Sequence, residues 1–172
     1  LGTTGELNVS GCHAPYNEAA ARGKMFVVST APAGVAPGTA LGTAAPLTLY
    51  NPPGSGVNLV VVESCIGYVS GTLGAGTVVY ASAAQTSAPT SGTALTPKNC
   101  LIGAGTGQGS AYQGSTHTTE TIVKPAFVLG AFLASTATPP QAPAFDFTEG
   151  KLVVAPGNVL SLQGIAAAGS TP

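Results

Sequence analysis

The longest strand candidate in the chain is an apolar run with the two-residue period of a β-strand. It is VNLVVVESCIGYVSG at residues 57–71, and near its middle both faces carry apolar side chains. Successive side chains of a strand point to opposite faces, so a run of this kind is typical of a strand covered on both sides. We therefore expect 57–71 to be a central strand, with Val61 and Val62 buried on opposite faces.

Shorter apolar runs, separated by clusters of Gly, Pro, Asn and Ser, fill most of the remaining chain. Strands are expected at 24–31, 46–50, 77–83, 118–135 and 144–148, then a turn at Glu149 and Gly150, then two closing strands. Pro125 has no N–H to donate, so its run marks a sheet edge, a bulge or a break. Many short strands with frequent turns predict an all-β chain, a β-sandwich and most simply a jelly roll.

The first 23 residues follow a different pattern. Residues 1–15 have no period, and YNEAAARGK at 16–24 is the one stretch that favours a helix. A helix this short is marginal by itself and needs a surface to dock on. We expect an irregular or short-helical N-terminal arm at 1–23 that packs on a neighbouring subunit, followed by a β-sandwich domain at 24–172.

Charged residues are scarce. They make up 6% of the 172 residues, against about 25% in a typical soluble domain. The five Lys and Arg residues are scattered and the net charge is −1, so no nucleic-acid partner is expected. The apolar stretch at 126–134 is shorter than the roughly 20 residues that span a bilayer, so no membrane partner is expected either. A chain with so few charges is expected to have its surface covered by other subunits, most simply in a homotrimer.

The cysteines and histidines do not have the spacing of a known site. Cys12, Cys65 and Cys100 are odd in number and widely spaced, which is not a disulfide framework. Structural zinc sites usually present two ligands from one short loop, and neither these cysteines nor His13 and His117 are spaced in that way. We expect buried free thiols, surface histidines and no bound metal.

The acidic residues are the remaining candidates for catalysis. Glu120, Asp146 and Glu149 could include a carboxylate pair for glycoside hydrolysis, but two of them flank the expected turn and nothing sets one pKa apart. The segment GAGTGQG at 103–109 lacks the third glycine of a dinucleotide loop and has no helix after it. We expect no enzyme and no cofactor.

One loop offers exposed contact residues. The glycine-punctuated segment 105–115 carries Gln108, Tyr112 and Gln113, and the other tyrosines fall in or beside expected strands. If this protein contacts a ligand through a loop, these three residues are the candidates.

Three motifs occur together along the chain. They are LYNPPGSG at 49–56, GYVSGTLGAG at 67–76 and PGNVLSLQG at 156–164, with YNEAAARGKMF upstream. As a set, over residues 16–172, they resemble a family of tailed-phage virion proteins. The resemblance implies a bacteriophage structural protein, assembled into the virion in the host cytoplasm.

Two roles are open for such a protein. A capsid decoration or cement protein would contact the major capsid protein and hold neighbouring capsomers together. A tail- or fibre-associated adhesin would instead bind a host surface receptor or glycan. Glycan sites usually present exposed aromatic rings, and this chain has no Trp. The cement role is therefore the favoured expectation.

Overall fold

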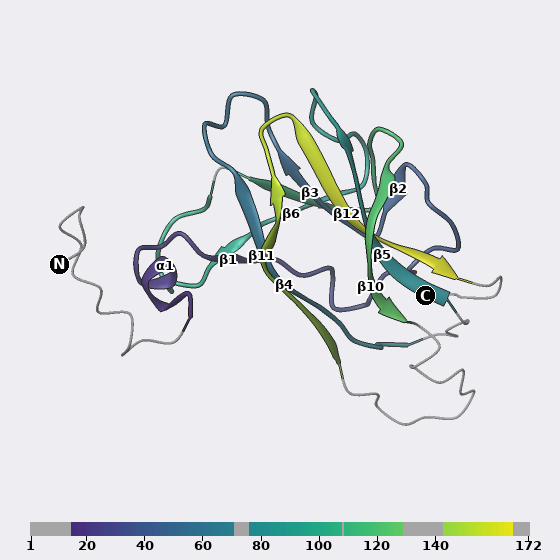
Figure 1. Ribbon diagram of the computed structural model, residues 1–172, viewed down its shortest axis with the longest axis horizontal. Helices are drawn as coiled ribbons and strands as arrows, with labels where there is room; N and C mark the ends of the chain where they lie inside the picture. The colour runs from purple at the N-terminus through teal and green to yellow at the C-terminus, as the bar shows by residue number, and fades with distance from the viewer. Residues whose placement is uncertain (1–14, 71–75, 108, 129–142, 167–172) are drawn as a thin grey trace. The chain divides into compact units, whose positions relative to one another are not determined.

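The protein is described by a computed structural model that covers residues 15–70, 76–107, 109–128 and 143–166 (Figure 1). Short strands make up most of the secondary structure. In chain order the elements are α1 Asn17–Ala21, β1 Phe26–Val27, β2 Ala44–Ala45, β3 Leu47–Asn51, β4 Leu59–Ile66, β5 Gly76–Ala84, β6 Thr93–Leu95, β7 Lys98–Asn99, β8 Ser110–Gln113, β9 Ser115–Thr116, β10 Thr121–Val128, β11 Ala144–Val154 and β12 Asn158–Ala166.

The chain divides into two compact units, with a boundary that differs from the expected one at residue 23. Unit 1 comprises Leu1–Val28 and Pro97–Gly107, and unit 2 comprises Ser29–Thr96 and Gln108–Pro172. Strand β1 belongs to unit 1 because it pairs with β7, a segment that sequence reasoning did not connect with the N-terminal arm.

Unit 1 has little interior. Its helix α1 contains no buried residue, and both residues of β1 are exposed. The expected helix is therefore present but shorter than 16–24, and the expected strand at 24–31 shrinks to two residues. The Asn99 side chain connects the two segments of unit 1. Its Nδ2 donates to the Gly23 carbonyl at 2.8 Å, and its Oδ1 accepts from the Leu101 amide at 2.9 Å.

Unit 2 is built of two antiparallel layers. The larger is a six-stranded sheet in the order β10-β5-β12-β3-β8-β6, and the smaller is the β11–β4 pair, drawn as a separate ribbon in Figure 1. This confirms the expected all-β sandwich. A jelly roll has eight strands in two Greek keys. The described strands of unit 2 divide into the six-stranded sheet, the β11–β4 pair and the short β2–β9 pair, so that finer expectation is not confirmed.

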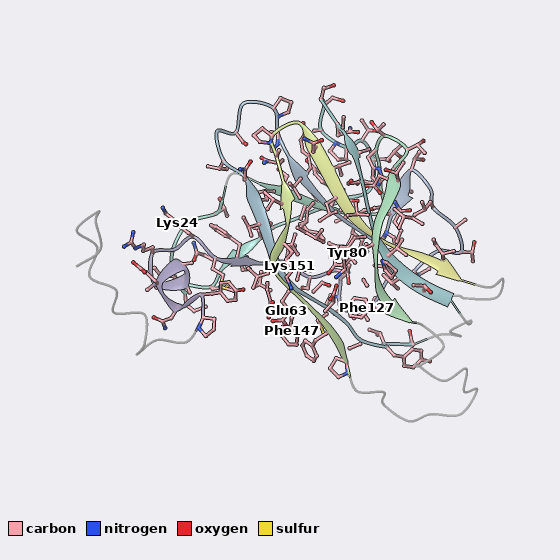
Figure 2. All side chains as sticks on the ribbon, viewed as in Figure 1. Lys24, Glu63, Tyr80, Phe127, Phe147 and Lys151 are labelled. Carbon is pink, nitrogen blue, oxygen red and sulfur yellow. The ribbon has the colours of Figure 1, made fainter. Side chains whose placement is uncertain are left out.

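The core lies between these two layers. One cluster joins Val78 and Phe127 to Ile66 of β4, and the other joins Tyr80 and Leu160 to residues of β4 and β11. Figure 2 labels Tyr80 and Phe127 in this region. Strands β5, β10 and β12 therefore supply one side of the core, and the β4–β11 ribbon supplies the other.

The central strand is β5, and the expectation for 57–71 is wrong. Four successive residues of β5, Val78 to Ala81, are buried, so both of its faces are covered. In the part of the chain that the structure describes, β4 pairs with β11 alone. Its Val60 is 53% exposed. An apolar run predicts a strand, but it does not reveal how many neighbours that strand has.

Val61 and Val62 are both half-buried, and a bulge explains why. Glu63 lies opposite Phe147 and Val61 lies opposite Leu152. Four residues of β11, 148–151, therefore face the single residue Val62. Such an irregularity shifts the alternation of inward and outward side chains, so the two valines do not occupy clean opposite faces.

The same bulge replaces the turn expected at Glu149 and Gly150. Both residues have left-handed backbone, with φ of 51° and 79°. The chain nevertheless continues in the same strand from Ala144 to Val154. Thr148 is buried, and its Oγ1 donates to the Val61 carbonyl across the bulge. The acidic-glycine pair marks a kink in β11, not a reversal.

Pro125 lies in an edge strand, as expected. Its strand β10 ends the six-stranded sheet, and register shifts occur on both sides of Pro125. Strands β6 and β8, in contrast, occupy stretches expected to be loops. Residues 129–135 of the expected strand 118–135 lie outside the described residues.

Candidate functional site

The outward surface of the β4–β11 ribbon is the most distinctive exposed surface of unit 2. Its four large apolar side chains are all at least half exposed: Val60 53%, Phe145 52%, Phe147 63% and Val153 52%. Glu63, Cys65 and Lys151 alternate with them and are also exposed. We call these seven residues the outer face.

Strand register brings the apolar members of the outer face together. Val60 lies opposite Val153, and Phe145 lies opposite Cys65. The rings of Phe145 and Phe147 are stacked, with centroids 6.1 Å apart. Cross-strand neighbours on one face contact each other, so Val60 lies beside Val153 on one side of the bulge, and the two phenylalanines lie together on the other side. Contiguous exposed apolar patches usually mark sites of interaction with another molecule.

The charges of the outer face are unequal. Lys151 Nζ lies 3.2 Å from Glu149 Oε2. Among the described residues, no cation pairs with Glu63, which lies opposite Phe147 within the apolar patch. Partial burial, and then the Glu63 carboxylate, raise the pKa of the Cys65 thiol. Figure 2 labels Glu63, Phe147 and Lys151 on this ribbon.

The opposite side of the ribbon is tied firmly to the large sheet. Ser64 Oγ and Tyr80 Oη are 2.5 Å apart, and Lys124 Nζ lies 2.8 Å from Asp146 Oδ2. The Lys124 ammonium also lies 5.4 Å from the centre of the Tyr80 ring. Burial is the main cause that raises the pKa of Tyr80 to about 12, and Asp146 adds to it. The outer face is therefore the free side of a well-anchored ribbon.

A second candidate site is buried on the other face of the six-stranded sheet. Ser161 Oγ and Gln163 Nε2 both donate to Glu120 Oε2, and Gln163 Oε1 accepts from the Gly42 amide at 2.9 Å. His117 Nε2 lies 4.0 Å from the same Glu120 oxygen. All four of these side chains belong to residues no more than 5% exposed. We call His117, Glu120, Ser161 and Gln163 the buried polar cluster.

The tautomer of His117 follows from its other contact. Nδ1 lies 2.9 Å from the Thr118 carbonyl. A carbonyl oxygen only accepts, so Nδ1 carries a proton. His117 Nε2 and Glu120 Oε1 have no hydrogen-bond partner among the described residues. Burial raises the pKa of Glu120, and Ser161, His117 and Gln163 oppose that rise.

This arrangement differs from a nucleophilic triad. In a triad the histidine lies between the serine and the carboxylate and takes the serine proton. Here Ser161 donates to Glu120 directly, and the four residues are closed off from solvent. The geometry suits a structural network, which joins β12 to the backbone of Gly42 and Thr43: the His117 amide donates to the Thr43 carbonyl at 2.9 Å. Sequence reasoning considered Glu120 and His117 separately and missed Ser161 and Gln163.

The predicted contact loop is not a loop throughout. Tyr112 and Gln113 belong to strand β8 and are half-buried. Gln113 Oε1 accepts a hydrogen bond from the Ala31 amide at 2.8 Å. Gln108 lies outside the described residues. The glycines that suggested a loop here in fact flank a short strand, since Tyr112 pairs with both Thr48 and Ala94.

The expected environments of the cysteines and of His117 are also corrected. Cys65 and Cys100 are exposed free thiols, where buried ones were expected. His117 was expected at the surface and is 5% exposed. Cys12 and His13 lie outside the described residues. Within the described ranges, no three His, Cys, Asp or Glu side chains gather as a metal site.

The three candidate carboxylates lie apart. Side chains alternate between the faces of a strand, so Glu120, which binds Ser161, lies on the face opposite the one that Leu160 and Tyr80 present to β11. Asp146 projects from β11 toward Lys124 and Tyr80, and Glu149 lies in the bulge. They form no facing pair of the kind that glycoside hydrolysis uses.

Comparisons of the chain with protein-family models, curated proteins and solved structures each find no match. Among the described helices, none is long and apolar enough to cross a membrane. The two sites above are therefore interpreted from their own geometry.

Proposed function

We propose that this protein is a structural subunit of a bacteriophage particle, most simply a capsid decoration or cement protein that contacts the major capsid protein. The observation that carries the proposal is the outer face: four large apolar side chains, each at least half exposed, on a ribbon anchored to a sandwich. A subunit of an assembly has a use for such a surface, because a neighbour covers it.

The low charge supports the same role. A dispersed monomer normally carries many charges of both signs on its surface, and only 6% of this chain is charged. Burial of apolar area stabilises contacts by about 25 cal/mol for each Å² removed from water. The outer face can contribute to such contacts through its apolar side chains, and Glu63 and Lys151 are its only charged members. The resemblance to virion proteins connects this assembly role with a phage particle.

The adhesin alternative has less support. Its candidate residues Tyr112 and Gln113 are half-buried in β8, and Gln113 is engaged by the Ala31 amide. An adhesin needs such side chains free for its receptor. A structural subunit needs only a neighbour that covers the outer face.

Particle labelling tests the proposed function. Antibodies raised against the purified chain would be applied to phage particles whose genomes encode it, and the copies per particle would be counted by quantitative mass spectrometry. Hundreds of copies on the head are expected for a cement protein, whereas a few to tens at the tail would favour an adhesin. Particles that lack the chain altogether would overturn the proposed function.

A further inference from the structure

We propose that the outer face of one copy is covered by unit 1 of a neighbouring copy, so that the protein associates with itself head to tail. This inference rests on the proposed function, and it specifies which molecule covers the outer face. Four observations point to unit 1 as the occupant, and the dependence of association on protein concentration tests whether it comes from a second copy.

First, unit 1 has no core of its own. None of its described residues, 15–28 and 97–107, is buried, and α1 packs no side chain away from solvent. A five-residue helix is not stable without packing. Unit 1 therefore needs an apolar surface to rest on.

Second, unit 1 presents apolar side chains outward. Val27 is 58% exposed and Ile102 is 92% exposed, and Phe26 and Leu101 are also exposed. The outer face presents Val60, Phe145, Phe147 and Val153. The two surfaces suit each other because both are apolar, and burying either one requires an apolar partner.

Third, the unpaired charges of the two surfaces are opposite. Glu18 pairs with Arg22, Lys124 with Asp146 and Lys151 with Glu149, and Glu120 accepts two hydrogen bonds in the buried polar cluster. Three charged side chains in the described ranges have no such partner: Glu63 on the outer face, and Lys24 and Lys98 in unit 1. Lys98 lies directly opposite the exposed Val27.

Fourth, covering the outer face with an apolar surface would strip water from Glu63. A carboxylate buried without a partner is strongly unfavourable, so the covering surface must bring a cation. Lys24 and Lys98 are the unpaired cations of the described chain, and both belong to unit 1. Two outer faces docked on each other would instead bring two unpaired carboxylates together.

A contact between two different surfaces is heterologous, and such contacts close into rings or continue as filaments. A closed ring of three copies would be the expected homotrimer. In this arrangement unit 1, which contains α1, links each copy to the next.

Charge reversal in the full-length chain tests the inference. Sedimentation velocity would be measured from about 1 to 100 µM for the wild type, for Glu63→Lys, for Lys24→Glu with Lys98→Glu, and for the triple variant. We expect the wild type to associate, both charge-reversed variants to weaken association by about tenfold or more, and the triple variant to restore it, because complementary charges fix register and partner. Thr86→Lys, which adds a cation to an exposed loop position, is the matched control and should associate like the wild type.

Each alternative has its own outcome. Concentration-independent monomers for the wild type would overturn the inference, and so would a triple variant that fails to recover while its thermal melting is normal. Association that survives Lys24→Glu with Lys98→Glu but is changed by Glu63→Lys would show outer faces docked on each other, which also overturns it. None of these results depends on the phage particle, so particle labelling can fail or succeed separately.

Discussion

Strands β4 and β5 are both rich in valine, yet they occupy opposite positions in unit 2. β5 has a hydrogen-bonded neighbour on each side, β10 and β12, and its residues Val78 to Ala81 are buried. β4 pairs with β11 only, within the described chain, and exposes Val60. The apolar residues of β5 hold the fold together. Those on the outer side of β4 contribute little to the fold and are available to another molecule.

The largest difference should appear when the same substitution is made in both strands. Val78→Asp places a charge beside Phe127 in the core, which costs several kcal/mol and should unfold much of the protein. Val60→Asp adds a charge at a half-exposed position and should change the free energy of unfolding by roughly 0.5 kcal/mol or less. Chemical denaturation of both variants measures the two values. Equal losses would mean that the outer side of β4 is part of the core.

The sequence predicts the strands better than it predicts their neighbours. Alternation and turn residues suffice for β3, β5, β10 and β12, because those signals are local. The pairing of β4 depends on register with β11, eighty residues or so further along the chain, and no local pattern records it. The Glu149–Gly150 pair illustrates the limit: its left-handed backbone suits a turn and a bulge equally.

The two sites differ in the same way. The buried polar cluster takes its residues from β12 and from the segment before β10, and each side chain by itself is an ordinary polar residue. Sequence spacing cannot bring Ser161 to Glu120, because the contact is created by the sheet. The outer face was missed for another reason: Phe145 and Phe147 look like core residues until the ribbon is known to have one free side.

Tyr80 tests how firmly β5 holds the ribbon. Tyr80→Phe removes the hydroxyl that contacts Ser64 Oγ and should lower the free energy of unfolding by about 1–2 kcal/mol near pH 8. The pKa of Tyr80 is raised from 10.0 to about 12 in the folded protein. A raised pKa stabilises the fold below pH 10, and this stabilisation is lost as the pH rises from about 10 to 12.

The difference between wild type and Tyr80→Phe should therefore shrink above pH 10. Urea denaturation at pH 8, 10 and 11.5 measures it. Tyr50 also has a raised pKa, but it is present in both proteins and cancels from the difference. A difference that stays constant across this range would show that the pKa of Tyr80 is not raised in the folded protein.

Glu120→Gln probes the other face of the sheet that contains β5. A glutamine carbonyl can still accept from Ser161 and Gln163. Burial raises the pKa of Glu120 above its ordinary 4.5, so the wild type gains stability from this residue below pH 4.5 and loses it as the pH rises through the folded-state pKa. The stability of the variant relative to wild type should therefore increase with pH.

We expect that increase to be of the order of 1 kcal/mol, the scale of one buried hydrogen bond, measured by thermal unfolding from pH 4 to pH 8. Glu149→Gln serves as the control, since that carboxylate is exposed and pairs with Lys151 at the surface. A similar pH trend in both variants would assign the effect to overall charge and not to burial.

The smallest effect concerns the outer face itself. Cys65 is exposed, and its pKa is raised first by partial burial and then by the Glu63 carboxylate. Glu63→Gln removes the second cause, so the pKa should fall and the fraction of reactive thiolate at pH 8 should increase. With the protein at sub-micromolar concentration, labelling of Cys65 by a thiol reagent should then be a few-fold faster than in the wild type.

Cys100 is the internal control. Its labelling rate should not change, because Glu63 is not among its neighbours in sequence or in register. If β4 were covered as β5 is, Cys65 would label slowly in both proteins and the substitution would make no difference, so an unchanged rate would contradict a free outer face.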